Sequence, residues 1–193
     1  MQDSKNTLLK SLSFYNDSKE YEHYREQEEV VEDLFDKYPQ NKDLKSVLLK
    51  VAVLDIFYST NLRMWGINEM AKHILNLNID EALKKGDISI VEKIANFTDS
   101  KGKHRFLYSF ASKYCFQHNR EKYVIFDSYV QKSLLYFNEK YNFCSFKLSQ
   151  ESLKDYSNLV KSINEIRAFY GFDTFSNRQI DHMLWVYGRE NFK

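Results

Sequence analysis

The stretch GKHRFLYSFASKYCFQHNREKYVIFDSYV, residues 102–130, contains the features that decide our fold prediction. It predicts a basic helix over 103–118 and a further helix from Ser128, with Asp127 directly before its first turn. Aspartate is common there, because its side-chain oxygen accepts a hydrogen bond from a backbone N–H group that the helix leaves free. We therefore expect helices joined by short turns on both sides of this stretch.

Glycine and proline are scarce along the chain, with five glycines and only Pro39 among 193 residues. Apolar residues recur every three or four positions, and no stretch shows the alternation with tight turns that strands require. The sequence therefore predicts an all-α protein. The expected helices span residues 2–14, 18–37, 43–59, 62–76, 79–85, 87–97, 103–118, 128–141, 149–170 and 175–190.

The helix over 43–59 is expected at the centre of the fold, because the run from Val47 to Phe57 is apolar almost all round. Asp55 interrupts this run, and a carboxylate is costly to bury unless it is paired or hydrogen-bonded. Asp55 is therefore either a satisfied structural carboxylate or part of the lining of a polar pocket.

Composition excludes several classes of protein. No apolar run approaches the roughly 20 residues that cross a bilayer, and the first thirty residues lack the apolar centre of a signal peptide, so we expect a cytoplasmic protein without a membrane partner. Two cysteines, Cys115 and Cys144, are too few for an iron–sulfur cluster or a structural zinc site. The five isolated glycines form no phosphate-binding loop. We expect no metal and no cofactor.

Charge is unevenly distributed although the net charge is only +1. Residues 1–44 contain eleven acidic and six basic side chains, which sum to −5. Residues 100–126 contain six basic side chains against Glu121 alone, which sum to +5. The basic segment is either a solvated helix face or a surface that binds an anionic polymer.

Four features follow one another over about residues 45–191. They are the helix that ends before Asn61, a turn at 98–102, the string Phe126-Asp127-Ser128-Tyr129-Val130, and a last helix that contains Trp185. Together they resemble the helix-hairpin-helix DNA glycosylase superfamily (HhH-GPD). The resemblance implies an all-α fold with two helical lobes around a cleft. It also implies a single domain over 1–193, with the hairpin core at about 45–145 and the N-terminal helices packed with 149–191.

The resemblance implies hydrolysis of the N-glycosidic bond of a flipped, damaged or modified base, with Asp127 as the catalytic residue. Backbone amides and the helix dipole keep a carboxylate ionised at a helix N-terminus. An ionised carboxylate can stabilise the oxocarbenium-like charge on the sugar and can orient or deprotonate the attacking water. Asp127 taken alone is also explained as an ordinary helix cap.

DNA contacts implied by the resemblance come from two turns. Asn61 stands where the family inserts a polar side chain into the duplex, although a polar residue there also suits a helix cap. The turn Thr98-Asp99-Ser100-Lys101-Gly102 keeps only the last glycine of the family's phosphate-binding hairpin. Basic side chains can supply charge to the same phosphates. The expected DNA-binding residues are Asn61, Lys101, Gly102, Lys103, His104 and Arg105.

Aromatic side chains near these turns suit a pocket that stacks on a flipped base. The expected pocket residues are Asp55, Tyr58, Trp65 and Tyr129. Bifunctional members of the superfamily use a nucleophilic lysine. Counting from Gly102 reaches His104, and counting back from Asp127 reaches Tyr108 or Ser109, so neither count finds a lysine. We therefore expect a monofunctional enzyme, with the adjacent Lys103 as the alternative Schiff-base former.

The sequence thus predicts a monomeric DNA glycosylase that acts on double-stranded DNA. Which base it removes is open, and so is the choice between repair and defence against modified foreign DNA. Two other interpretations remain: a helical DNA-binding module without chemistry, and a helical protein-interaction domain that uses the acidic N-terminal helices. Salt-dependent affinity for DNA is expected only for the two DNA interpretations.

Overall fold

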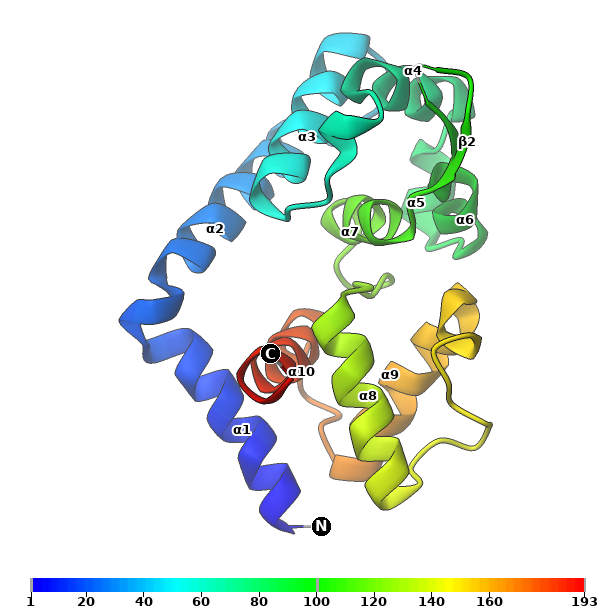
Figure 1. The fold of residues 1–193 in the computed structure, drawn as a ribbon. Coiled ribbons are helices and arrows are strands. Elements are labelled where there is room, and N and C mark those ends of the chain that lie inside the picture. The colour runs from blue at the N-terminus through cyan, green and yellow to red at the C-terminus, as the bar shows by residue number, and fades with distance from the viewer. Residues whose placement is uncertain (1, 100, 193) are drawn as a thin grey trace. The chain divides into compact units, whose positions relative to one another are not determined.

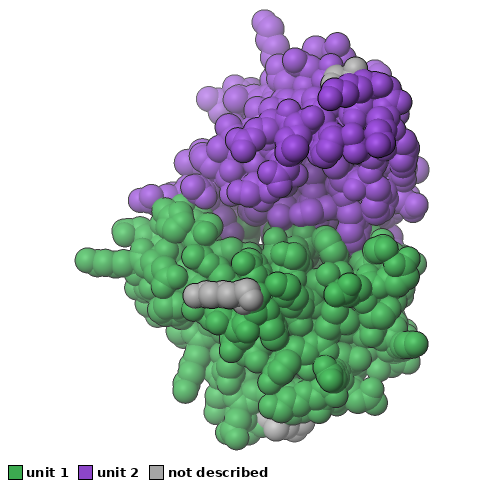
Figure 2. Space-filling view, viewed as in Figure 1, with its two compact units in different colours: residues 1–25, 124–193 green, residues 26–123 purple. Residues whose placement is uncertain are grey.

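The computed structural model describes residues 2–99 and 101–192, and most of them lie in helices (Figure 1). The prediction of an all-α protein is confirmed, apart from one small two-stranded sheet. The chain folds into two compact units (Figure 2). Unit 1 contains Met1–Arg25 and Val124–Lys193, and unit 2 contains Glu26–Tyr123. The expected core over about 45–145 therefore crosses the boundary between the units.

Unit 2 is built around α3 (Leu44–Phe57), which packs against α4 (Ile67–Leu77) and α7 (Tyr108–His118). Val47, Val51 and Leu54 of α3 are fully buried, as the apolar run predicted. The short turn η2 (Leu62–Met64) joins α3 to α4. The other elements of unit 2 are most of α2 (Glu22–Lys37), α5 (Asp80–Lys85), α6 (Ser89–Ala95), β1 (Asn96–Thr98) and β2 (His104–Phe106).

Unit 1 is centred on α10 (Asn177–Asn191), which packs against both α1 (Gln2–Asp17) and α8 (Ser128–Tyr141). Gly188 allows α8 and α10 to approach closely, since a Cβ atom at this position would lie 2.4 Å from the carbonyl oxygen of Tyr129. The remaining elements of unit 1 are η1 (Lys19–Tyr21), η3 (Ser152–Lys154) and α9 (Tyr156–Tyr170).

The predicted helices over 87–97 and 103–118 are too long, because residues 96–98 and 104–106 form antiparallel strands. The turn between them therefore joins two strands, and the predicted pair of short helices around this turn is wrong. Phe97 is buried while Asn96 and Thr98 are exposed, which is the alternation of a strand. Three residues are too few for that alternation to stand out in the sequence.

The other helix boundaries agree with the prediction to within a few residues, except at the start of two helices. The helices predicted over 62–76 and 149–170 begin later, at Ile67 and Tyr156, after the short 3-10 turns η2 and η3. Asp127 precedes α8 as expected, and its side chain accepts a hydrogen bond from the Tyr129 N–H group. In the described part of the chain, no helix has both the length and the apolar content needed to cross a bilayer.

Candidate nucleic-acid interface

The turn of the β-hairpin is organised by the buried carboxylate of Asp99. Its oxygens accept hydrogen bonds from the backbone N–H groups of Lys101 and Lys103 and from Arg105 Nε, each at 2.9 Å. The hydrogen bond from Lys103 and the pairing with Arg105 hold the pKa of Asp99 below its usual range. Gly102 completes the turn at a φ of 75°, a conformation that glycine adopts at little cost. Ser100 lies outside the described residues.

The predicted DNA-binding residues of this hairpin divide into two groups. Lys101, Gly102, Lys103 and His104 are exposed. Arg105 instead pairs with Asp99, and its guanidinium carbon lies 3.6 Å from the centre of the Trp65 ring. Arg105 therefore joins the hairpin to the segment that follows η2, and its charge is largely neutralised inside the unit.

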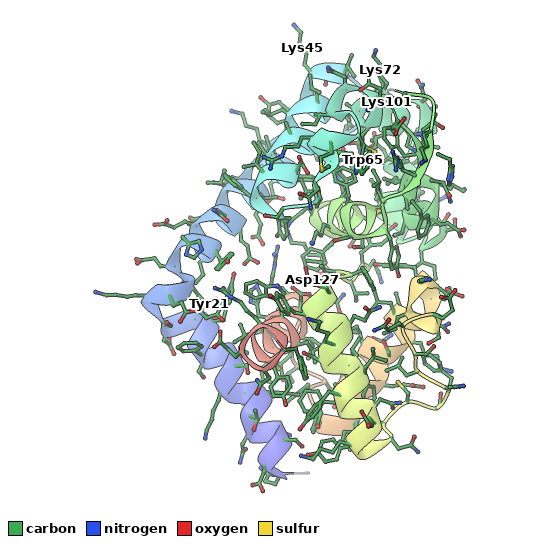
Figure 3. The ribbon with its side chains drawn as sticks, in the orientation of Figure 1. Tyr21, Lys45, Trp65, Lys72, Lys101 and Asp127 are labelled. Atoms are coloured by element: carbon green, nitrogen blue, oxygen red, sulfur yellow. The ribbon has the colours of Figure 1, made fainter. Side chains whose placement is uncertain are left out.

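Trp65, expected in the base pocket, is consequently a packing partner of Arg105. Figure 3 shows Trp65 and Lys101 on the same unit, with Lys101 at the hairpin.

The second predicted DNA contact lies on the turn that Asp55 stabilises. Asp55 is buried, and its carboxylate accepts hydrogen bonds from Thr60 Oγ1 at 2.6 Å, from the Leu62 N–H group at 2.6 Å and from the Arg63 N–H group at 3.0 Å. These bonds favour the structural interpretation of Asp55 over a place in the pocket lining. They fix the backbone on both sides of Asn61.

Asn61 is exposed and adopts a left-handed conformation with a φ of 59°, which asparagine tolerates better than most residues. Asn61 stands at the N-cap position of η2, but its side chain makes no capping hydrogen bond to that turn. Met64, three residues later, is 65% exposed on the same turn. Sequence reasoning did not single out Met64, because a methionine next to Trp65 is typical of a core.

Lys113 is a further lysine that lies close to the position where bifunctional glycosylases carry their nucleophile, and sequence reasoning did not single it out. It is buried in α7, its Nζ donates a hydrogen bond to Ser109 Oγ at 3.0 Å, and it lies 5.6 Å from the centre of the Tyr58 ring. Gln117 Nε2 donates to the Tyr58 hydroxyl at 2.7 Å. Counting back from Asp127 reached Ser109, and the lysine one helical turn later contacts that serine. The helical spacing of 109 and 113 was the signal that could have revealed it.

The expected basic face over 100–126 is divided among different environments. Lys113 is buried, Arg105 is paired with Asp99, and Arg120 pairs with Asp36 at 3.2 Å. The basic side chains of this segment therefore do not form one solvated helix face. The exposed positive charge of the segment lies at the hairpin turn and at Lys122.

A buried polar network holds α3 to the loop that precedes it. Lys50 Nζ lies within hydrogen-bond distance of the carbonyl oxygens of Tyr38 and Gln40, both at 3.0 Å, of Asn41 Oδ1 at 2.7 Å and of His118 Nε2 at 3.3 Å. Burial lowers the pKa of Lys50 to about 8. Burial, followed by the nearby Lys50 charge, lowers the pKa of His118 well below its usual value. The sequence did not predict this network.

The predicted catalytic residue lies in unit 1. Asp127 is half-exposed at the N-terminus of α8, where its Oδ1 accepts the Tyr129 N–H group at 2.9 Å. Tyr129, expected in the base pocket, packs its ring against Trp185 with centroids 6.4 Å apart. The predicted site residues therefore divide between the units, with Asp127 and Tyr129 in unit 1 and the others in unit 2.

A family model, HI_0787_N, described as an N-terminal domain, matches residues 8–122. A protein of Haemophilus influenzae that bears the name "Uncharacterized protein" is 37% identical over 150 residues, which cover 77% of this chain and 69% of that protein. No solved structure matches the chain. The matched residues include α3, the turn with Asn61, the β-hairpin and α7, and they end beside the boundary of unit 2. The chain belongs to the HI_0787_N family.

Proposed function

We propose that this protein is a DNA glycosylase that hydrolyses the N-glycosidic bond of a flipped base in duplex DNA, with Asp127 as the catalytic carboxylate. The observation that carries the proposal is the position of Asp127, half-exposed at the N-terminus of a 14-residue helix. Its Oδ1 accepts the Tyr129 N–H group at 2.9 Å, which holds the carboxylate at the helix terminus. It remains accessible enough to meet a substrate.

The reaction needs little more than this carboxylate and water. Asp127 stabilises the positive charge that develops on the sugar and accepts a proton from the attacking water. The water oxygen forms a bond to C1′, the bond from C1′ to the base nitrogen breaks, and the departing base takes its electron pair and a proton from solvent. The product is an abasic site, as expected for a monofunctional enzyme.

Unit 2 supplies two features that support duplex binding. Lys101 and Lys103 are exposed at the hairpin and can neutralise phosphates. Asn61 and Met64 are exposed on a turn that Asp55 holds rigid through three hydrogen bonds. Architectural DNA-binding proteins insert apolar side chains, methionine among them, between base steps, as Met64 could do, and this unstacking is also what base flipping requires.

The second candidate is a DNA-binding module without chemistry. It is favoured by the hairpin, where the turn joins two strands instead of the two helices that the glycosylase resemblance implies. For both candidates we propose a monomeric protein in the cytoplasm that binds chromosomal or foreign DNA. For the first candidate we propose a glycosylase fold of the helix-hairpin-helix type, and its support is the order of α3, the Asn61 turn and Asp127 along the chain.

Base release separates the candidates. Duplexes that each carry one altered base are incubated with the wild-type protein and then treated with alkali, which breaks the strand at abasic sites. A glycosylase produces breaks on at least one duplex, and Asp127→Asn reduces them at least a hundredfold. Binding without breaks on the whole panel supports the second candidate. Absence of salt-dependent DNA binding contradicts both and supports the protein-interaction interpretation.

A further inference from the structure

The outer face of the β-hairpin carries four side chains that the strand register brings together. Asn96 pairs with Phe106 and Thr98 pairs with His104. Side chains alternate between the two faces of a strand, so these four lie on one face, and all four are exposed. Phe97 and Arg105 form the opposite face, which packs toward the body of unit 2.

This face is held in place before any partner binds. Asn96 Nδ2 donates to the carbonyl oxygen of Glu92 at 3.0 Å, and Asn96 Oδ1 lies 3.2 Å from His104 Nε2. The Phe106 ring stacks on Tyr108 with centroids 5.7 Å apart while the side chain stays 47% exposed. Side chains that are already ordered lose less entropy on binding.

The charge of the hairpin favours an anionic partner. Asp99 is the acidic residue of its turn, and Arg105 neutralises it through the ion pair at 2.9 Å. Lys101 and Lys103 at the turn are exposed, and the exposed His104 follows them directly. The hairpin therefore presents a net positive end beside an outer face of aromatic, amide and hydroxyl groups.

The dimensions of the hairpin match one groove of duplex DNA. Two antiparallel strands lie about 4.8 Å apart, and three residues extend about 10 Å along each strand. The major groove, about 12 Å wide and 8.5 Å deep, admits such a ribbon together with its side chains. The minor groove of regular B-DNA, at about 6 Å, is narrower than a ribbon that carries a phenylalanine and a histidine, so the major groove fits better.

We propose that the hairpin formed by residues 96–99 and 101–106 enters the major groove of duplex DNA with its outer face toward the base edges. Asn96 and His104 contact hydrogen-bonding groups of the bases, and Phe106 contacts thymine methyl groups. Lys101 and Lys103 contact the flanking phosphates. This inference rests on the DNA binding proposed above and specifies how that binding occurs.

Which groove the hairpin enters is tested with three duplexes of the same sequence. One is unmodified, a second carries glucosylated 5-hydroxymethylcytosine, which fills the major groove, and a third is saturated with a ligand that fills the minor groove. We expect the affinity of wild-type protein to fall at least tenfold on the second duplex and to change less than twofold on the third. The reverse pattern overturns the inference and leaves the proposed glycosylase intact.

The hairpin itself is tested by Lys101→Ala/Lys103→Ala. Because this variant lacks two side chains that bind phosphates, the slope of log affinity against log salt should become shallower by about 2. The matched control is Lys84→Ala/Lys85→Ala, which removes two exposed lysines from α5 in the same unit. We expect at least a tenfold loss of affinity for the hairpin variant and less than twofold for the control.

Equal losses of DNA affinity in the two lysine variants overturn the proposal that the hairpin contacts DNA. Tighter binding of wild-type protein to single-stranded DNA of the same sequence than to the duplex also overturns it. Wild-type protein that shows no salt-dependent affinity for any DNA contradicts the proposed function itself. Circular dichroism melting curves of both variants are recorded as a control, to establish that each is folded at the temperature of the assay.

Discussion

Asp55→Ala is expected to destabilise unit 2 far more than a typical substitution. The carboxylate of Asp55 is buried and accepts three hydrogen bonds, two of them from backbone N–H groups. Alanine leaves those donors without this acceptor, at a cost of roughly 1–3 kcal/mol for each buried group. Such losses are not additive, so we expect about 3–5 kcal/mol in total. Domains are stable by only about 5–15 kcal/mol, so the variant keeps its fold with a small margin.

The two tryptophans of the chain allow each unit to be followed separately. Trp65 lies in unit 2 and Trp185 in unit 1. Urea unfolding is measured by fluorescence in a Trp185→Phe background, where Trp65 reports on unit 2 alone. Thr60→Ala is the matched partial change, because it removes one of the three donors and should cost about 1 kcal/mol. A measured destabilisation below about 1 kcal/mol for Asp55→Ala refutes the view that this carboxylate organises the Asn61 turn.

Three further outcomes follow from the geometry. Burial lowers the pKa of Lys50 from 10.5 to about 8, so between these pH values the unfolded chain binds more protons than the folded one. The free energy of unfolding of the wild type should therefore rise by about 1.5 kcal/mol relative to Lys50→Met between pH 8 and pH 9.5. Parallel urea titrations that show no relative rise contradict this. Gly188→Ala should cost about 2 kcal/mol in unit 1 despite its better helix propensity, since the added Cβ meets a carbonyl oxygen at 2.4 Å; an unchanged thermal midpoint is the contrary result. Borohydride should trap no covalent complex with DNA, and any adduct that does form is assigned by its loss in Lys103→Ala or in Lys113→Ala.

The helices could be predicted from the sequence because most of them show a strong local pattern. The run from Val47 to Phe57 has no polar face, and α3 is accordingly central in unit 2. Asp127 precedes a helix with one buried, largely apolar face, and its side chain caps α8. Caps and apolar spacing are properties of neighbouring residues, so they can be read without knowledge of the tertiary structure.

The strands could not be predicted, because their stability depends on residues distant in sequence. Only Phe97 of β1 is buried, and Arg105 of β2 is held by the ring of Trp65, forty residues earlier. Basic composition likewise suggested one cationic helix, whereas tertiary contacts place Lys113 in the interior and pair Arg120 with Asp36. Composition counts charges but does not show which of them the fold neutralises.

Only part of the candidate site could be predicted from the sequence, for the same reason. Asn61 is exposed on a turn, as its position between two helices suggested. Met64 and Lys113 were missed, because a methionine and a basic residue in a helix have ordinary explanations in sequence terms. Their exposure and burial, respectively, follow from packing within unit 2.

The central claim concerns the carboxylate of Asp127, and single-turnover base release tests it most directly. Asp155 provides the control, because it caps α9 in the same unit and accepts the Ser157 N–H group at 2.8 Å, just as Asp127 accepts Tyr129. Asparagine caps helices as well as aspartate does, so neither substitution should change stability much. We predict that Asp127→Asn lowers the rate at least a hundredfold while Asp155→Asn stays within threefold of wild type. Base release by Asp127→Asn at the wild-type rate would contradict the account.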